Sequence, residues 1–220
     1  MRKGLLFLIA VGFVSLVQAK ILCFNYGDSL TTNTCLLVKK TFERMFPHDD
    51  FEMKNISEIK EKRFYAKIIY IAGYGQPEKG FWLDKRGLEK INWCKILENL
   101  NAYVLLIDSC YSGKIFECQN KRIPIIISST TGNCVSVNNI VNGKPYSTFS
   151  LMLACLVGLF PECEKIKGCN FPFSPQVCQL GWILLKHNWS NQTLEFLLDF
   201  PDLHPNICLG TTLFNGKPWK

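Results

Sequence analysis

The sequence predicts an α/β protein, in which a mostly parallel sheet is buried between two layers of helices. Short apolar runs rich in Ile, Leu and Val alternate along the chain with segments whose apolar residues recur at helical spacing. The apolar runs are continuous rather than alternating in polarity, which is typical of strands that are buried on both faces. Because strands that alternate with helices build parallel sheets, a three-layer α/β/α architecture is expected.

The first predicted elements are a strand, a helix and a short strand. Residues 20–26 are apolar and are followed by Gly27, so they are predicted to form a strand. Residues 31–46 have apolar side chains at helical spacing, and Pro47 lies just past them, which predicts a helix. A short strand is expected at residues 51–53.

The middle of the chain continues the same alternation. Residues 66–72, 102–107 and 123–128 are apolar runs of strand length. Residues 87–100 and 147–159 carry apolar residues at helical spacing and are predicted to be helices. These elements complete the core of the expected sheet and its covering layers.

The C-terminal third is rich in cysteine and proline and gives weaker signals. We expect it to be a disulfide-rich extension of the same domain. Its candidate elements are residues 180–185, 194–198 and 207–213.

The chain begins with a predicted signal peptide at residues 1–19. Arg2 and Lys3 precede an apolar run at residues 4–17, and Ala19 completes a small-x-small cleavage site. An uncleaved anchor is the alternative, but the apolar run is short for a membrane span and a cleavage site follows it. The mature domain is therefore expected to cover residues 20–220, to be secreted and to have no membrane association after cleavage.

Cysteine usage agrees with the secretory pathway. The chain has 11 cysteines, an odd number, so five disulfides and one free thiol are the simplest expectation. No C-x-x-C pair occurs and the spacings are irregular, so zinc is not expected. No calcium loop is seen either, and neither a metal nor a cofactor is expected. The cysteines are Cys23, Cys35, Cys94, Cys110, Cys118, Cys134, Cys155, Cys163, Cys169, Cys178 and Cys208.

Three N-x-S/T sequons predict glycosylation at Asn55, Asn188 and Asn191.

The formal net charge is +7, but the basic residues are scattered among acidic ones and form no stripe with interleaved aromatics. Nucleic acid is therefore not an expected partner.

Two of the strong strands end in conspicuous turns. Gly73-Tyr74-Gly75 follows one strand, and Asp108-Ser109-Cys110 follows the next strong strand. Because function collects beyond the carboxyl ends of parallel strands, these two turns are expected to open on the same edge and to form the site.

These turns resemble those of the caspase-like cysteine peptidases, with the metacaspases as the nearest branch. In that family one strand ends in a small residue followed by Gly-His-Gly, and the next ends in Asp, Ser or Ala, Cys, His or Tyr, and Ser-Gly. This sequence has AGYG at residues 72–75 and DSCYSG at residues 108–113. The resemblance covers most of residues 20–159 and implies a caspase-like fold.

The resemblance also implies roles for individual residues. Cys110 takes the position of the nucleophile, and the backbone N–H groups of Gly75 and Cys110 take the oxyanion hole. Asp108 takes the acidic floor of the pocket for the residue before the scissile bond, which in metacaspases goes with Arg or Lys specificity. Since a buried carboxylate needs a cationic partner, the implied partner is a peptide or protein with basic residues.

One departure from the family decides the expected function, because Tyr74 stands where the family has its catalytic histidine. An imidazole takes the proton of the thiol and later gives one to the leaving amine. A phenol is protonated at neutral pH and cannot serve as that base. The sequence therefore predicts a pseudoenzyme, a cysteine endopeptidase homologue that binds peptides or modulates a partner.

Three alternatives stay open at the level of sequence. An active endopeptidase that cleaves after Arg or Lys could use a displaced histidine, with His204 as first choice and His187 as second. Gly27-Asp28-Ser29-Leu30 spells the nucleophile block of the GDSL esterases, which would make Ser29 the nucleophile. An extracellular scaffold with Cys110 in a disulfide would have no working cleft.

Overall fold

The structure is a computed structural model, and it describes most of the first 159 residues together with two short C-terminal strands. The predicted signal peptide, two of the three sequons, His187, His204 and the candidate elements at 180–185 and 194–198 lie outside the described residues. The described residues are 20–76, 80–84, 87, 89–119, 122–130, 132–133, 135–136, 138–159, 213–214 and 217–218.

The centre of the molecule is a seven-stranded sheet in the order β12-β11-β8-β7-β3-β1-β2. Five of its strands are parallel to their neighbours, and an antiparallel hairpin of β11 and β12 continues the sheet beyond β8. The strands are β1 (Lys20–Asn25), β2 (Asp50–Asn55), β3 (Phe64–Ala72), β7 (Leu100–Asp108), β8 (Ile125–Ser128), β11 (Leu213–Phe214) and β12 (Lys217–Pro218).

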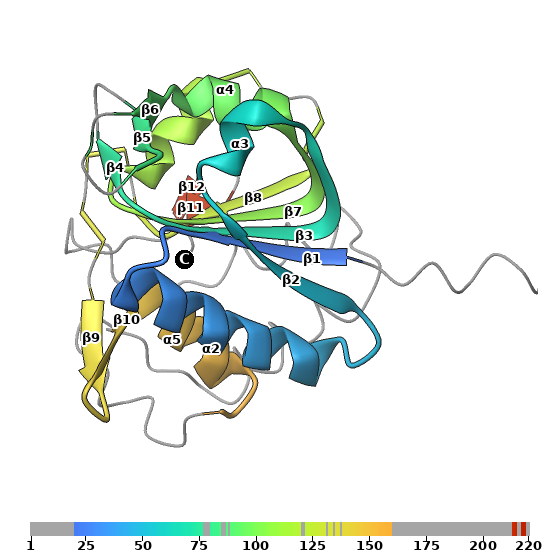
Figure 1. Ribbon diagram of the computed structural model, residues 1–220, viewed down its shortest axis with the longest axis vertical. Coiled ribbons are helices and arrows are strands. Elements are labelled where there is room, and N and C mark those ends of the chain that lie inside the picture. The colour runs from blue at the N-terminus through green and yellow to red at the C-terminus, as the bar shows by residue number, and fades with distance from the viewer. Residues whose placement is uncertain are drawn as a thin grey trace, which may run out of the picture.

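Helices cover both faces of this sheet, as Figure 1 shows. One face packs against α2 (Ser29–Met45) and α5 (Thr148–Leu156). The other face packs against α3 (Glu58–Glu61), α4 (Trp93–Asn99) and the 3₁₀ helix η1 (Ser112–Glu117). The three-layer α/β architecture with a mostly parallel sheet is therefore confirmed.

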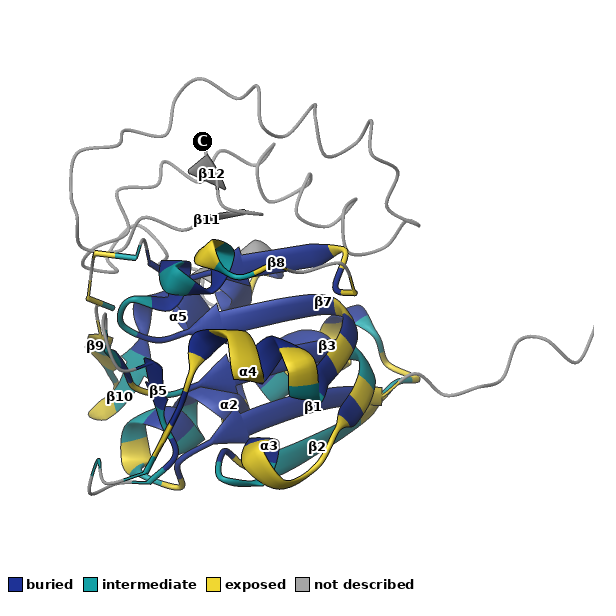
Figure 2. Ribbon diagram, turned by 90° about the horizontal axis from the view of Figure 1, so that it is seen from above, coloured by how far each residue is buried: buried dark blue, intermediate teal, exposed yellow. Residues whose placement is uncertain are grey.

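The central strands are buried on both sides, which explains their continuous apolar sequences. Figure 2 shows β1, β8 and the second halves of β3 and β7 mainly in the colour of buried residues. Along β7, for example, Leu105 and Ile107 face the α3–α4 layer, whereas Val104 and Leu106 face the α2–α5 layer. Apolar side chains are thus needed at consecutive positions of the strand.

Two small antiparallel sheets lie beyond the carboxyl edge of the main sheet. The first joins β4 (Gly75–Gln76), β5 (Gly80–Trp82) and β6 (Lys90–Ile91). The second is a hairpin of β9 (Asn138–Val141) and β10 (Lys144–Ser147).

The helix predicted at residues 87–100 is wrong in its first part. Lys90 and Ile91 pair with β5 as a strand, and the helix begins only at Trp93. Asn92 sets this start, because its side chain accepts a hydrogen bond from the Cys94 N–H at 2.8 Å. The other predicted strands and helices in the described residues are present, with ends shifted by a few residues. The segment expected at 207–213 shares only Leu213 with β11, and its other residues lie outside the described ones.

Two disulfides lie in the described part of the chain. Cys23–Cys35 joins β1 to α2 in the buried layer, and Cys94–Cys118 joins α4 to the end of η1. Cys110 is a free thiol, so it does not take the disulfide that the scaffold alternative required. The other three predicted disulfides fall on cysteines whose side chains the structure does not describe. No helix in the described segments is long and apolar enough to cross a membrane.

Candidate functional site

The two turns singled out in the sequence lie side by side at the carboxyl edge of the main sheet. Strands β3 and β7 are parallel neighbours, with Ala72 paired to Asp108, and the Gly73 N–H donates to the Asp108 carbonyl at 3.0 Å. Tyr74 and Cys110 each follow their paired residue by two positions. The fold therefore brings the predicted nucleophile and the residue in the histidine position to one place.

The turn that contains Tyr74 approaches Cys110 so closely that only glycine fits at position 75. A Cβ atom placed on Gly75 would lie 2.1 Å from the carbonyl oxygen of Cys110 and 2.8 Å from the Trp93 ring. Trp93 also donates from Nε1 to the Gln76 carbonyl at 3.3 Å, which fixes this turn from the other side. Whether the Gly75 N–H serves an oxyanion remains a prediction.

The phenol of Tyr74 is held by a carboxylate. It is 38% exposed, and its hydroxyl donates to Asp28 Oδ2 at 3.0 Å. Its ring also packs edge-on against Tyr26, with 5.1 Å between the ring centroids. Partial burial and the negative charge of Asp28 raise the pKa of Tyr74 to about 12, so the phenol is protonated at neutral pH and cannot accept a proton from a thiol.

The thiol of Cys110 is half-buried and also favours its protonated form. Its Sγ accepts a hydrogen bond from the Ser136 N–H at 3.2 Å. Burial nevertheless raises the pKa of Cys110, and the nearby carboxylate of Asp108 adds to this effect. Because the thiolate is the nucleophile, the surroundings of Cys110 suppress its reactivity.

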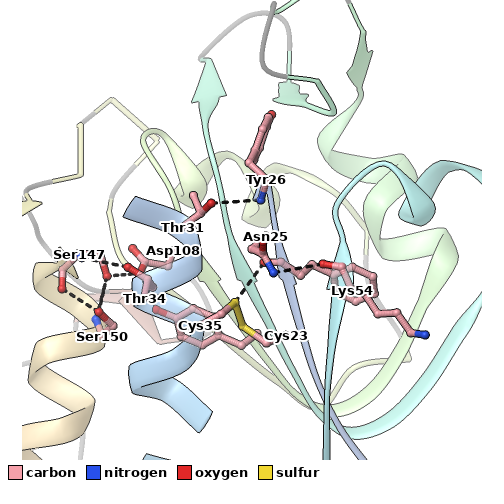
Figure 3. The surroundings of a disulfide bond; sticks show 12 residues. Cys23, Asn25, Tyr26, Thr31, Thr34, Cys35, Lys54, Asp108, Ser147 and Ser150 are labelled. Atoms are coloured by element: carbon pink, nitrogen blue, oxygen red, sulfur yellow. Dashed lines mark hydrogen bonds between the residues drawn. A yellow bond between two sulfur atoms is a disulfide. The ribbon is translucent and has the colours of Figure 1, made fainter. Parts of the chain in front are cut away.

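Asp108 lies beneath this pair and is only 4% exposed. Its carboxylate accepts hydrogen bonds from the Tyr70 and Ser147 hydroxyls, on the face that packs against α2 and α5. Ser147 in turn accepts from the Ser150 N–H at 3.0 Å and so caps the start of α5, as Figure 3 shows. The described contacts of Asp108 are thus internal, and they join β7 to the start of α5.

We expect the carboxyl group of Asp108 to make stability depend on pH. Burial raises the pKa of Asp108 from 3.8 to about 6, and the hydrogen bonds from Ser147 and Tyr70 offset only part of this rise. The folded protein therefore holds more protons than the unfolded chain between about pH 4 and pH 6. The protein is more stable while Asp108 is protonated, and this stability is lost as the pH rises through that window. From this group alone, the free energy of unfolding should fall by about 2 kcal/mol between pH 4 and pH 7.

Chemical denaturation at several pH values measures this effect. The difference between pH 4 and pH 7 should shrink in Asp108→Asn relative to the unsubstituted protein. Asp50→Asn, which changes an exposed carboxylate at the opposite edge of the sheet, is the control and should keep the original difference. An unchanged pH dependence in Asp108→Asn would contradict this account.

Asp28 is a site residue that the sequence did not single out as a functional group. Its Oδ1 accepts from the Thr31 N–H at 2.8 Å and caps the start of α2, while its Oδ2 holds Tyr74. An aspartate just before a helical pattern is a recognisable cap signal, but its contact with Tyr74 depends on the sheet order. Ser29, the nucleophile of the esterase alternative, is an exposed residue in the first turn of this helix.

No imidazole reaches the site from the described residues. His48 is exposed and follows the far end of α2, next to the start of β2 and so at the opposite edge of the sheet. Within the described segments, no group of three or more His, Cys, Asp or Glu side chains is arranged to hold a metal ion.

Tyr26 carries the buried side-chain oxygen that has no hydrogen-bond partner among the described atoms. The residue is 4% exposed, and burial raises the pKa of Tyr26. A buried hydroxyl without a partner costs free energy, so Tyr26→Phe should raise the free energy of unfolding by about 1 kcal/mol. Urea denaturation checks this. The control is Tyr70→Phe, which removes a hydroxyl that donates to Asp108 and should instead destabilise.

Comparison with known proteins adds no relative to this description. No protein-family model matches the sequence, and no curated protein matches it. The fold and the site therefore define a class and no family. The protein is a three-layer α/β protein with a free thiol at the carboxyl edge of its sheet.

Proposed function

We propose that this protein is a secreted, catalytically silent homologue of the caspase-like cysteine peptidases that binds peptide segments with basic residues. The observation that carries the proposal is the pairing of Tyr74 with Asp28 next to Cys110. A carboxylate-bound phenol occupies the place where a cysteine peptidase needs an imidazole, and losing acid–base catalysis costs on the order of two to four decades of rate.

The charge around the site supports a cationic ligand. Among the described residues, no lysine or arginine forms an ion pair with Asp28 or Asp108. Asp28 is half-buried at the edge of the sheet, where a ligand side chain can approach it. A guanidinium or ammonium group would therefore meet a carboxylate that has no cationic partner.

The two disulfides support passage through an oxidising compartment, which the predicted signal peptide also requires. Secretion is the simplest localisation that accounts for both features.

The absence of hydrolysis is tested with fluorogenic peptides that carry Arg or Lys before the reporter group. The mature protein and its Cys110→Ala variant should both give no turnover above the uncatalysed rate. Turnover that disappears in Cys110→Ala would contradict the proposal and favour the alternative of a displaced histidine, which His204→Ala and His187→Ala would then examine.

Binding is tested with the same peptides and with matched peptides in which neutral citrulline replaces arginine. Asp28→Asn is the informative variant, because asparagine keeps the helix cap but removes the charge. Fluorescence anisotropy should show weaker binding of the Arg peptide to Asp28→Asn and no such loss for the citrulline peptide. Equal affinity of the unsubstituted protein for both peptides would rule out recognition of a basic side chain.

A further inference from the structure

Asn55 is the sequon asparagine that the structure describes, and it lies at the same edge of the sheet as Cys110. It is the last residue of β2, the outermost strand of the sheet on that side, and its side chain is exposed. A glycan at this position would meet no buried surface.

The local conformation leaves the amide nitrogen of Asn55 available. Asn55 Oδ1 accepts from the Ser57 N–H at 2.9 Å and from the Ser57 hydroxyl at 2.7 Å. Since an N–H group can only donate, Ser57 engages the oxygen of the Asn55 amide and not its nitrogen. No hydrogen bond from Asn55 Nδ2 is formed within the described residues. The sequon serine thus sits against the side chain whose nitrogen would carry the sugar.

The middle residue of the sequon packs beneath the Tyr74 turn. Ile56 is fully buried, and its Cδ1 atom lies 3.0 Å from the position that a Cβ atom on Gly73 would take. The strand register places Asn55 at the same edge. A row of paired residues crosses the four strands β2, β1, β3 and β7, and Asn55 in β2 and Asp108 in β7 each lie one residue beyond that row. Three strand spacings separate Asn55 from the end of β7, on the order of 15 Å.

We propose that Asn55 carries an N-linked glycan at the rim of the Tyr74–Cys110 site, and that this glycan screens the site from large ligands. The proposal rests on the secretion and on the ligand-binding site proposed above. A bulky, solvated sugar on the neighbouring strand end would leave room for flexible peptide segments but would hinder a folded protein surface.

The modification requires an enzyme-bound, lipid-linked oligosaccharide as donor. Asn55 Nδ2 forms a bond to the anomeric carbon of the first sugar, the bond between that carbon and a phosphate oxygen breaks, and the lipid pyrophosphate leaves. One proton passes from Nδ2 to a base of the transferase, so no oxidant or reductant takes part.

Occupancy is tested on the full chain expressed in a secretory eukaryotic host. Enzymatic release of N-glycans in heavy-oxygen water converts a glycosylated asparagine to labelled aspartate, which peptide mass spectrometry detects. Position 55 should carry the label in the unsubstituted protein and in Ser57→Thr, which keeps the sequon, but not in Ser57→Ala. If Asn55 is unlabelled in a chain that has lost its predicted signal peptide, the glycan proposal alone is overturned. If Asn55 is unlabelled and the signal peptide is retained, the proposed secretion is overturned as well.

Screening is tested through Cys110, with N-ethylmaleimide as a small probe and a polyethylene-glycol maleimide as a large one. Mass spectrometry of the peptide that contains Cys110 reports each reaction. Ser57→Ala should accelerate the reaction with the large reagent severalfold and leave the reaction with the small reagent unchanged. Equal rates with the large reagent in Ser57→Ala and Ser57→Thr would show that the glycan does not screen the site.

Discussion

Tyr74→His should accelerate the alkylation of Cys110 by iodoacetamide at pH 7 by about tenfold or more, because each unit by which the thiol pKa falls raises the thiolate fraction about tenfold. In the native protein, burial and the charge of Asp108 raise the pKa of Cys110, and the neighbouring phenol carries no positive charge. An imidazole at position 74 can hold a proton beside the sulfur and stabilise the thiolate as an ion pair.

Tyr74→Phe is the matched control for this substitution. It removes the hydroxyl that donates to Asp28 without introducing a titratable group, so alkylation should not gain the same acceleration. Peptide mass spectrometry of the fragment with Cys110 measures both rates. Equal rates in Tyr74→His and Tyr74→Phe would show that position 74 does not control the thiol, and the proposed cause of the lost activity would fail.

Gly75→Ala should lower the free energy of unfolding by about 3 kcal/mol, at the upper end of the cost of overpacking. The added Cβ would lie 2.1 Å from the carbonyl oxygen of Cys110, which is a backbone atom and cannot rotate away. Relief requires one of the two turns to move. The same substitution is therefore expected to disturb the contact between Tyr74 and Asp28.

Gly132→Ala is the control for this prediction. Its added Cβ would come no closer than 3.4 Å to the flexible side chain of Lys114, so its effect should stay within about 0.5 kcal/mol. Urea denaturation compares the two variants with the unsubstituted protein. A Gly75→Ala protein as stable as Gly132→Ala would mean that the two turns are not in close contact.

Much of the sheet could be predicted from the sequence because its strands are buried on both faces. Runs such as residues 66–72 and 102–107 leave few alternatives to a central parallel strand. The meeting of Tyr74 with Cys110 followed from the general rule that the carboxyl ends of parallel strands share one edge. The resemblance to caspase-like peptidases pointed to the same residues.

The errors lie where local signals compete. Residues 87–91 have the apolar spacing of a helix, but pairing with β5 makes Lys90 and Ile91 a strand. The hairpin of β9 and β10 was not predicted, although Asn142 and Gly143, both with positive φ, form the Asn-Gly turn that is typical of two-residue hairpin loops. That signal was present in the sequence.

The contacts of the site depend on the tertiary fold and could not be predicted in this way. The bond between Tyr74 and Asp28 joins residues 46 positions apart, and the Ser136 N–H that faces Cys110 lies 26 positions further along. The partners of Asp108 likewise come from β3 and from the residue before α5. No local pattern of residues reports such contacts.

The pH dependence of Cys110 alkylation in the unsubstituted protein tests most directly whether the thiol is silenced. The rate of reaction with iodoacetamide, followed at this residue by mass spectrometry, should rise with an apparent pKa above that of the same cysteine in a free peptide of residues 104–114. An apparent pKa below that of the peptide would reveal an activated thiolate, which the proposed pseudoenzyme does not contain.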